Sequence, residues 1–108
     1  MTRFTPGREM DEAVGEAVGL NGWYRFSTSD GEAITAIELL IKDELAAGVD
    51  ITYTLETVAP PDEWVSTISI HPNTQFSMPV NYEDYGKTPA EAICHSILKY
   101  RGVETDEV

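Results

Sequence analysis

The sequence predicts an α+β fold, in which a three-stranded antiparallel sheet packs with helices in the order α-α-β-β-β-α. Three observations lead to this prediction: two helical apolar stripes, then three β-patterned runs joined by short turns, then one capped helix. Short turns between successive strands favour an antiparallel meander. The helices can bury one sheet face, which gives a two-layer domain, or an α-β-α sandwich if the first helix lies on the other face.

The first helix is expected over residues 8–18, because Met10, Val14 and Val18 recur at every fourth position and form one apolar stripe. Gly19 follows and is a typical helix stop. The second helix is expected over residues 30–47. The hydroxyl groups just before it can cap its first turn: Ser27, Thr28 and Ser29.

The second helix carries a broad apolar surface. Its main stripe is expected to consist of Ile34, Ile37, Ile41 and Leu45, flanked by Ala33 and Leu40. Leu39 lies off this stripe, either as a lone exposed leucine or as a contact with another subunit. Gly48 is the expected stop of this helix.

Three strands are expected over residues 50–58, 63–71 and 74–82. In each run, alternation places one set of residues on the same face. In chain order these sets are Ile51, Tyr53 and Leu55; Trp64, Ile68 and Ile70; and Phe76, Met78, Val80 and Tyr82. Pro79 lies inside the third run, which predicts an edge strand or a bulge. The carboxylate pairs Asp62–Glu63 and Glu83–Asp84 are expected in solvated turns.

The closing helix is expected over residues 88–102. Thr88 is a strong N-cap, Pro89 suits the first helical position, and Glu91 completes a capping box. The helix contains Cys94 beside His95, but adjacent helical residues do not face each other, so a catalytic pair is not expected. Cys94 is predicted to be a buried apolar residue, with His95 directed toward Glu91 and Lys99.

Composition limits the function classes. The chain of 108 residues is expected to be one domain, with an ordered core over about 7–102 and a frayed acidic tail over 103–108. Its 19 acidic and 7 basic residues give a net charge of −12, which argues against direct binding of nucleic acid or an anionic membrane. One cysteine, no signal-peptide pattern and no membrane-length apolar run favour a cytoplasmic location.

The sequence lacks the spacing of known catalytic and metal motifs. It has no nucleophile-elbow, phosphate-binding or calcium-loop pattern. His71, Cys94 and His95 do not have zinc-ligand spacing. We therefore expect no enzyme activity, no cofactor and no metal.

The cluster best suited to binding is Trp23-Tyr24-Arg25-Phe26. Aromatic rings can stack on a flat base, and an arginine fork can hold a phosphate. The alternative interpretation is that Trp23 and Phe26 close the core beneath the loop, and we favour it for Trp23. Residues with a candidate role in ligand binding are Trp23, Tyr24 and Arg25, and the other cations that could hold an anion, His71, Lys87, Lys99 and Arg101.

Four segments together resemble a family of small bacteriophage proteins, the phage ABA sandwich domain: "AVGLNGWY", "FSTSDGEAITAIELL", "EWVSTISI" and "GKTPAEAICHSIL". The resemblance spans about residues 7–102 and is strongest in the final helix. It implies a phage or prophage origin, and with it the host bacterial cytoplasm as the location, and a two- or three-layer α/β fold. The layout is also similar to phage sponges that disarm Thoeris immunity by holding a cyclic ADP-ribose-type signal between subunits.

The resemblance and the missing catalytic spacing favour a counter-defence protein that sequesters a nucleotide-derived immune signal, as a homo-oligomer. The alternative is an acidic inhibitor that mimics nucleic acid and binds a host defence protein. Its expected contacts are Glu9, Glu12, Glu16, Asp43, Glu44 and the tail. A third hypothesis is a virion or assembly accessory protein.

Overall fold

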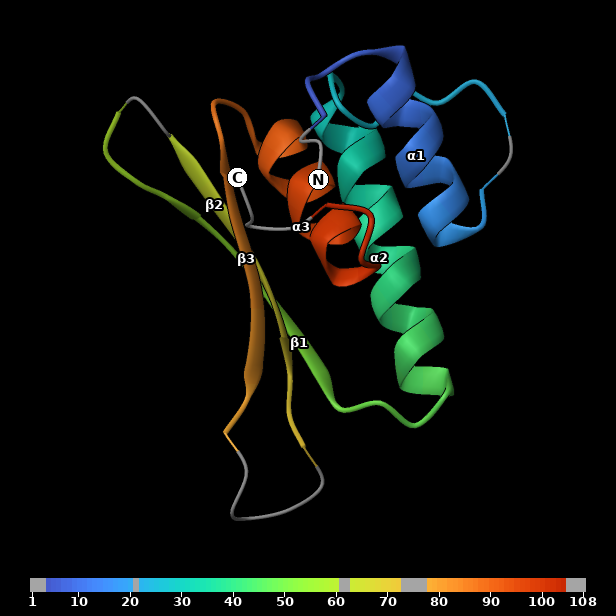
Figure 1. Cartoon of the computed structure of the whole chain (residues 1–108), viewed down its shortest axis with the longest axis vertical. Helices are drawn as coiled ribbons and strands as arrows, with labels where there is room; N and C mark the ends of the chain where they lie inside the picture. The colour runs from blue at the N-terminus through green and yellow to red at the C-terminus, as the bar shows by residue number, and fades with distance from the viewer. Residues whose placement is uncertain (1–3, 21, 61–62, 73–77, 105–108) are drawn as a thin grey trace.

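The computed structural model describes residues 4–20, 22–60, 63–72 and 78–104. Its elements are α1 (Arg8–Val18), α2 (Asp30–Ala46), β1 (Ile51–Thr57), β2 (Trp64–Ile70), β3 (Val80–Gly86) and α3 (Pro89–Tyr100) (Figure 1). The predicted α+β class and element order are confirmed. None of the helices in the described ranges is long and apolar enough to span a bilayer.

The sheet is an antiparallel meander in the order β1-β2-β3. Its register places Tyr53 opposite Ile68, and Ile68 opposite Tyr82. These residues share the face that packs on the helices, as the alternation in β1 and β2 predicts. The opposite face carries mainly small polar side chains: Thr52, Thr54, Thr67, Ser69 and Asn81.

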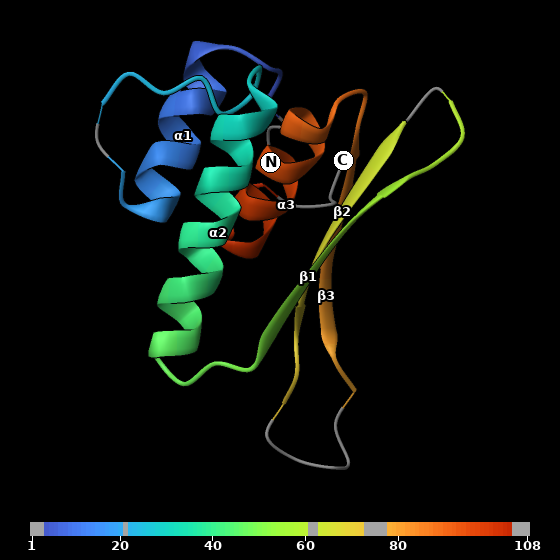
Figure 2. The same ribbon diagram turned by 180° about the vertical axis from the view of Figure 1, so that it is seen from behind.

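All three helices lie on the same side of the sheet (Figures 1 and 2). Helix α3 packs directly on β2 and β3, α2 packs against α3 and β1, and α1 packs on α2 and α3. The observed arrangement is therefore the two-layer alternative, with the first helix on the same face as the others. The polar outer face explains this, because it offers a helix little apolar surface to bury.

Helix α3 is the centre of the core. Eight of its 12 residues are buried, and they include the polar residues His95 and Ser96. Fully buried apolar side chains from other elements surround it: Met10, Val14, Phe26, Ala36, Leu40 and Ile68. A helix buried on nearly all sides needs hydrogen-bond partners inside the protein for its polar side chains, here His95 and Ser96.

The predicted helix ends agree with the structure. Gly19 ends α1 in the left-handed conformation, with φ 77°. Ser29 caps α2 by accepting from the Glu32 N–H, and Thr88 caps α3 by accepting from the Glu91 N–H. The Glu91 side chain in turn accepts from the Lys87 N–H at 2.9 Å, one residue before the cap.

The third strand lies further along the chain than the sequence predicts. It begins at Val80, just after Pro79, and continues through Glu83 and Asp84, which were expected in a turn. Asp84 therefore lies on the inner face, in register with Ser66. Asp62, Phe76 and residues 105–108 of the expected tail lie outside the described residues.

The end of β3 approaches α3 very closely. A Cβ placed on Gly86 would lie 2.6 Å from the Ala92 nitrogen, so only glycine fits there without movement of the backbone. This close approach brings the inner face of β3 against the first half of α3.

The buried face of α2 differs from the predicted stripe. Ala33, Ala36, Ile37 and Leu40 are buried, whereas Ile34 and Leu45 are 41% and 55% exposed, and Leu39 is half-buried. The small alanines allow α2 to approach α3 closely, so α2 is rotated toward α3. Ile37, Ile41 and Leu45 line a hollow of about 330 Å³ beside β1, together with Tyr53.

Candidate functional site

A cavity of about 1030 Å³ lies between α1 and the loop that joins it to α2, described at residues 19–20 and 22–29. We call this cavity the α1–α2 cleft. Its α1 side is lined by Gly7, Arg8, Asp11, Glu12, Gly15 and Glu16. Its loop side is lined by Leu20, Gly22, Trp23, Tyr24, Arg25, Phe26 and Thr28.

Phe26 and Ser27 hold the loop against α1. Phe26 is buried, and Tyr24 stacks on it with ring centroids 4.9 Å apart. The N–H and the hydroxyl of Ser27 both donate to Asp11 Oδ1, at 2.7 and 2.6 Å. The Gly7 N–H donates to the Ser27 hydroxyl at 2.8 Å. The base of the cleft is therefore a hydrogen-bonded part of the fold.

Trp23 does not close the core, contrary to the expectation favoured from the sequence. Phe26 is buried in the core beneath the loop, whereas Trp23 is left 88% exposed at the cleft. The Arg8 guanidinium lies 5.0 Å from the centroid of the Trp23 ring, a cation–π contact. Arg8 is not predicted from the sequence, because nothing local shows that the loop folds back over the start of α1.

The cleft combines cations with carboxylates. Arg8 Nε also donates to Glu12 Oε1 at 2.9 Å, and both side chains are largely exposed. Arg25 is exposed, and its backbone N–H donates to Glu32 Oε1 at 3.1 Å. The arrangement can stack a planar ring, pair an anion with a guanidinium, and accept hydrogen bonds from hydroxyl or amino groups.

The other predicted cations do not line this cleft. His71 Nε2 is hydrogen-bonded to the Thr52 hydroxyl at 2.9 Å, and Lys87 is exposed in the turn before α3. Lys99 Nζ donates to the Glu83 carbonyl at 2.8 Å. Arg101 donates to the Ala17 carbonyl and pairs with Glu44, so it connects the end of α3 to α1 and α2. Trp23, Tyr24 and Arg25 are therefore the predicted residues that the structure brings together at the cleft.

Cys94 is buried, as predicted, and its neighbour His95 is directed elsewhere. Burial raises the pKa of the Cys94 thiol, and the negative charges of Asp11, Glu104 and Glu91 raise it further. A thiol in this environment stays protonated and is a poor nucleophile.

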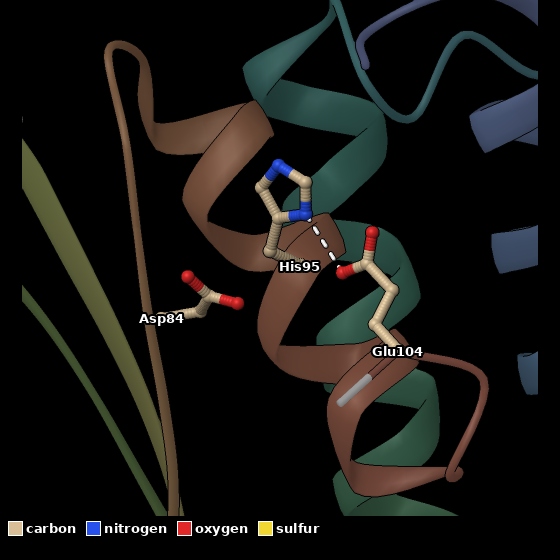
Figure 3. A group of neighbouring side chains, drawn as sticks. All are labelled: Asp84, His95 and Glu104. Carbon is tan, nitrogen blue, oxygen red and sulfur yellow. Dashed lines mark hydrogen bonds and ion pairs between the residues drawn. The ribbon is translucent and has the colours of Figure 1, made fainter. Parts of the chain in front are cut away.

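A buried polar group absent from the sequence prediction lies beside α3: Asp84, His95 and Glu104, called here the His95 cluster (Figure 3). His95 Nδ1 lies 2.8 Å from Glu104 Oε1. Glu104 is only 2% exposed, although the sequence places it in a frayed tail, and Asp84 is 8% exposed. Glu104 is held inside because its second oxygen accepts from the Phe4 N–H at 2.6 Å.

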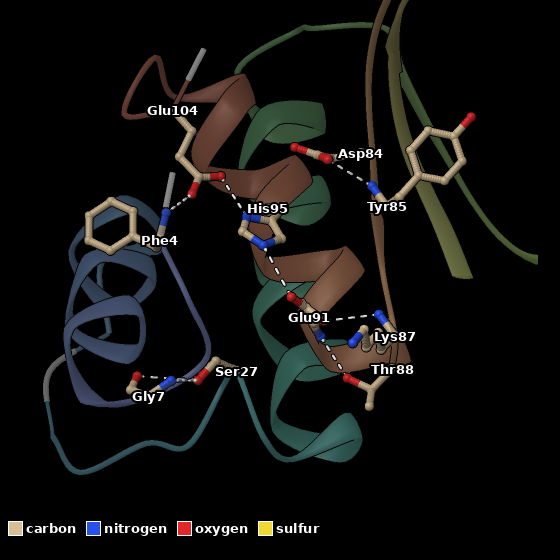
Figure 4. Close-up of polar contacts among 10 residues, drawn as sticks. All are labelled: Phe4, Gly7, Ser27, Asp84, Tyr85, Lys87, Thr88, Glu91, His95 and Glu104. Carbon is tan, nitrogen blue, oxygen red and sulfur yellow. Dashed lines mark hydrogen bonds and ion pairs between the residues drawn. The ribbon is translucent and has the colours of Figure 1, made fainter. Parts of the chain in front are cut away.

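The second ring nitrogen of His95 is less well satisfied. Within the described part of the chain, the buried Nε2 has no hydrogen-bond partner. The nearest carboxylate oxygen is Glu91 Oε2 at 3.6 Å, as the sequence analysis anticipated from the helical wheel (Figure 4). The ring therefore lies between two carboxylates, one close and one beyond hydrogen-bond distance.

A separate chain of hydroxyls joins the sheet to α3. The Tyr53 hydroxyl is hydrogen-bonded to Ser66 at 2.7 Å, and Ser66 to Ser96 at 2.6 Å. Ser96 also donates to the Ile93 carbonyl. Burial raises the pKa of Tyr53 to about 12. Each of these hydroxyls has a hydrogen-bond partner, so their role is explained by the packing of α3 on the sheet.

No protein-family model, curated protein or solved structure matches this chain. The resemblance to the phage ABA sandwich domain, and the phage origin that it implies, therefore stay predictions.

Proposed function

We propose that the protein binds a nucleotide-type small molecule in the α1–α2 cleft without converting it, and so sequesters a nucleotide-derived immune signal during phage counter-defence. The observation that carries this proposal is the exposed Trp23 ring beside Arg8, at the edge of a cavity of about 1030 Å³. Small-molecule sites commonly have volumes of about 300–1000 Å³. Burying the indole against a planar base would remove a large apolar surface from water.

The charges of the cleft restrict the ligand. A phosphate would pair with Arg8 or Arg25, and Arg8 would exchange its exposed contact with Glu12 for the ligand. The carboxylates of Glu12 and Glu16 repel an isolated phosphate but accept hydrogen bonds from sugar hydroxyls or base amino groups. A ligand with rings, hydroxyls and few charges fits this environment best, which favours a cyclic nucleotide or a cyclic ADP-ribose.

Binding without catalysis agrees with the lining of the cleft. Its described lining residues include no histidine, cysteine or lysine, and the protonated Cys94 thiol is buried away from it. Sequestration needs affinity alone, so a site of stacking and hydrogen-bonding groups is sufficient.

The test is thermal unfolding of the purified protein with a panel of cyclic dinucleotides, cyclic trinucleotides and cyclic ADP-ribose isomers. A ligand at a hundred times its dissociation constant adds about 2.7 kcal/mol to the free energy of unfolding. In a domain of this size we expect the melting temperature to rise by roughly 10 °C. Trp23→Ala and Arg25→Ala should lose the rise, whereas Lys87→Ala, which changes an exposed cation outside the cleft, should keep it. No rise with any compound would overturn the proposal.

The second candidate function is the acidic inhibitor of a host defence protein. It is favoured by Glu9, Glu12 and Glu16, which are exposed along α1. Glu44, an expected contact, instead accepts from the Tyr100 hydroxyl at 2.6 Å and pairs with Arg101. A host pull-down at low and high salt tests this function, because exposed charges are screened within about 8–10 Å at physiological ionic strength. The expected homo-oligomer is tested by light scattering of the purified protein.

A further inference from the structure

We propose that the His95 cluster binds one divalent transition-metal ion, which fastens the segment after α3 to β3 and α3. Its three potential ligands come from three separate parts of the fold: Asp84 from β3, His95 from α3, and Glu104 from the segment that follows α3 (Figure 3). This proposal is independent of the ligand bound in the α1–α2 cleft.

The geometry of the His95 cluster suits one small ion. The donor atoms lie within 4.8 Å of one another, and all three residues are buried. A point between them lies within about 2.8 Å of each, so shifts of less than about 1 Å reach the ~2.0–2.2 Å of zinc–nitrogen and zinc–oxygen bonds. Side-chain rotations are enough for such shifts.

The charge of the His95 cluster also favours a cation. Asp84 and Glu104 are buried carboxylates, and each can carry a negative charge. Within the described residues, Glu104 has no Lys or Arg ion pair; its partners are His95 and the Phe4 N–H. Buried carboxylates are unfavourable unless they are paired or coordinate a metal, and a divalent ion would add to the pairing of Glu104 with His95.

The groups around the His95 cluster match those that orient metal ligands. If Nδ1 coordinates the ion, the ring proton moves to Nε2, which now lies 3.6 Å from Glu91 Oε2 and has no hydrogen-bond partner among the described residues. A metal-bound histidine commonly donates its other N–H to a carboxylate. Glu91 is already positioned for this by the Lys87 N–H, which donates to its other oxygen (Figure 4).

The carboxylate ligands are oriented in the same way. Asp84 Oδ1 accepts from the Tyr85 N–H at 2.8 Å, and Glu104 Oε2 accepts from the Phe4 N–H. One imidazole nitrogen with two carboxylate oxygens suits ions of intermediate hardness, such as Zn²⁺ or Mn²⁺, more than Mg²⁺, which prefers oxygen ligands alone. Water can complete the coordination.

The first test uses the full chain after chelator treatment, with Zn²⁺ titrated by calorimetry. We expect one equivalent to bind and the melting temperature to rise, while Mg²⁺ has little effect. Glu104→Gln and Asp84→Asn should each abolish that equivalent, and Glu91→Gln should weaken it by about 10–100-fold. His71→Gln, which changes the other histidine, is the matched control and should bind as the wild type does.

A second measurement needs no variant and covers the case in which a substitution prevents folding. Mn²⁺ added to the isotope-labelled wild-type protein broadens the amide signals of residues close to the ion. We expect the strongest broadening at Tyr85, Ser96 and Val103, next to the three ligands. Broadening confined to the exposed acidic face of α1, no binding of Zn²⁺ or Mn²⁺, or equal binding by the ligand variants would overturn the proposal.

Discussion

The α1–α2 cleft and the His95 cluster both gather charged side chains, but in opposite environments. In the cleft, Arg8 pairs with Glu12 in the solvent, and Trp23 is left 88% exposed. In the His95 cluster, His95 and Glu104 are both almost fully buried and 2.8 Å apart. Charges in water need no particular partner, whereas buried charges must find one.

The difference separates the residues available for binding from those required for folding. The Arg8–Glu12 pair can be exchanged for a ligand with little loss, because exposed pairs contribute about 0–1 kcal/mol. The His95 cluster instead joins Phe4, β3, α3 and Glu104, so a change there affects several segments at once.

His95→Ala should lower the free energy of unfolding by about 3–5 kcal/mol, because it leaves Glu104 buried without its ring partner. Arg25→Ala, in the cleft, should change it by less than about 0.5 kcal/mol, as for other exposed positions. Urea denaturation followed by circular dichroism measures both. Equal effects of the two substitutions would remove the contrast between the regions.

Gly86→Ala should lower the free energy of unfolding by about 1–3 kcal/mol, because the added Cβ would meet the backbone of Ala92 at 2.6 Å. Since Gly86 sets how closely β3 approaches α3, the substitution should also move Asp84 relative to His95. Gly31→Ala is the matched control: apart from its chain neighbours and the adjacent backbone of α2, no atom lies within 4 Å of its Cβ position, so the change should be neutral or stabilising. If both variants unfold at the same urea concentration, the close approach does not limit stability.

High pH should destabilise the fold through two tyrosines. Burial raises the pKa of Tyr53 to about 12, and burial together with the hydrogen bond to Glu44 raises that of Tyr100 to about 12. Both groups hold their protons more tightly when folded, so their contribution is complete below the unfolded pKa of about 10 and is lost between about pH 10 and 12. Absorbance at high pH follows tyrosine ionisation, and Tyr53→Phe should reduce the loss of stability. A stability that stays constant through this range would contradict the assignment.

Much of the fold could be predicted from local patterns. Apolar stripes and caps define the helices, and alternation defines β1 and β2, because these signals depend on neighbouring residues. The third strand was placed too early, because the apolar run before Pro79 is more β-like than the sequence of β3 itself. On α2, the burial of Ala33, Ile37 and Leu40 agrees with the prediction. Ile34 and Leu45 are exposed instead, because the helix turns its alanine side, including Ala36, toward α3.

The candidate sites were predicted less well, because they depend on contacts between distant residues. The aromatic–arginine loop was found from composition, but the partner Arg8 and the exposure of Trp23 follow from how the loop folds over α1. Glu104 looked like part of a solvated tail, and no local signal shows that Phe4, 100 residues away, would hold it. The histidine–cysteine spacing excluded one kind of zinc site, but it says nothing of ligands supplied by β3.

The most direct test of the proposed binding site is an NMR titration of the labelled wild-type protein with the nucleotide panel. The two tryptophans provide an internal comparison, because Trp23 lies at the cleft and Trp64 lies in β2. We predict that one compound shifts the Trp23 indole signal and the amides of Gly7, Gly15 and Arg25, while the Trp64 indole signal stays in place. No shift with any compound, or shifts that leave the Trp23 signal unchanged, would contradict nucleotide binding in the α1–α2 cleft.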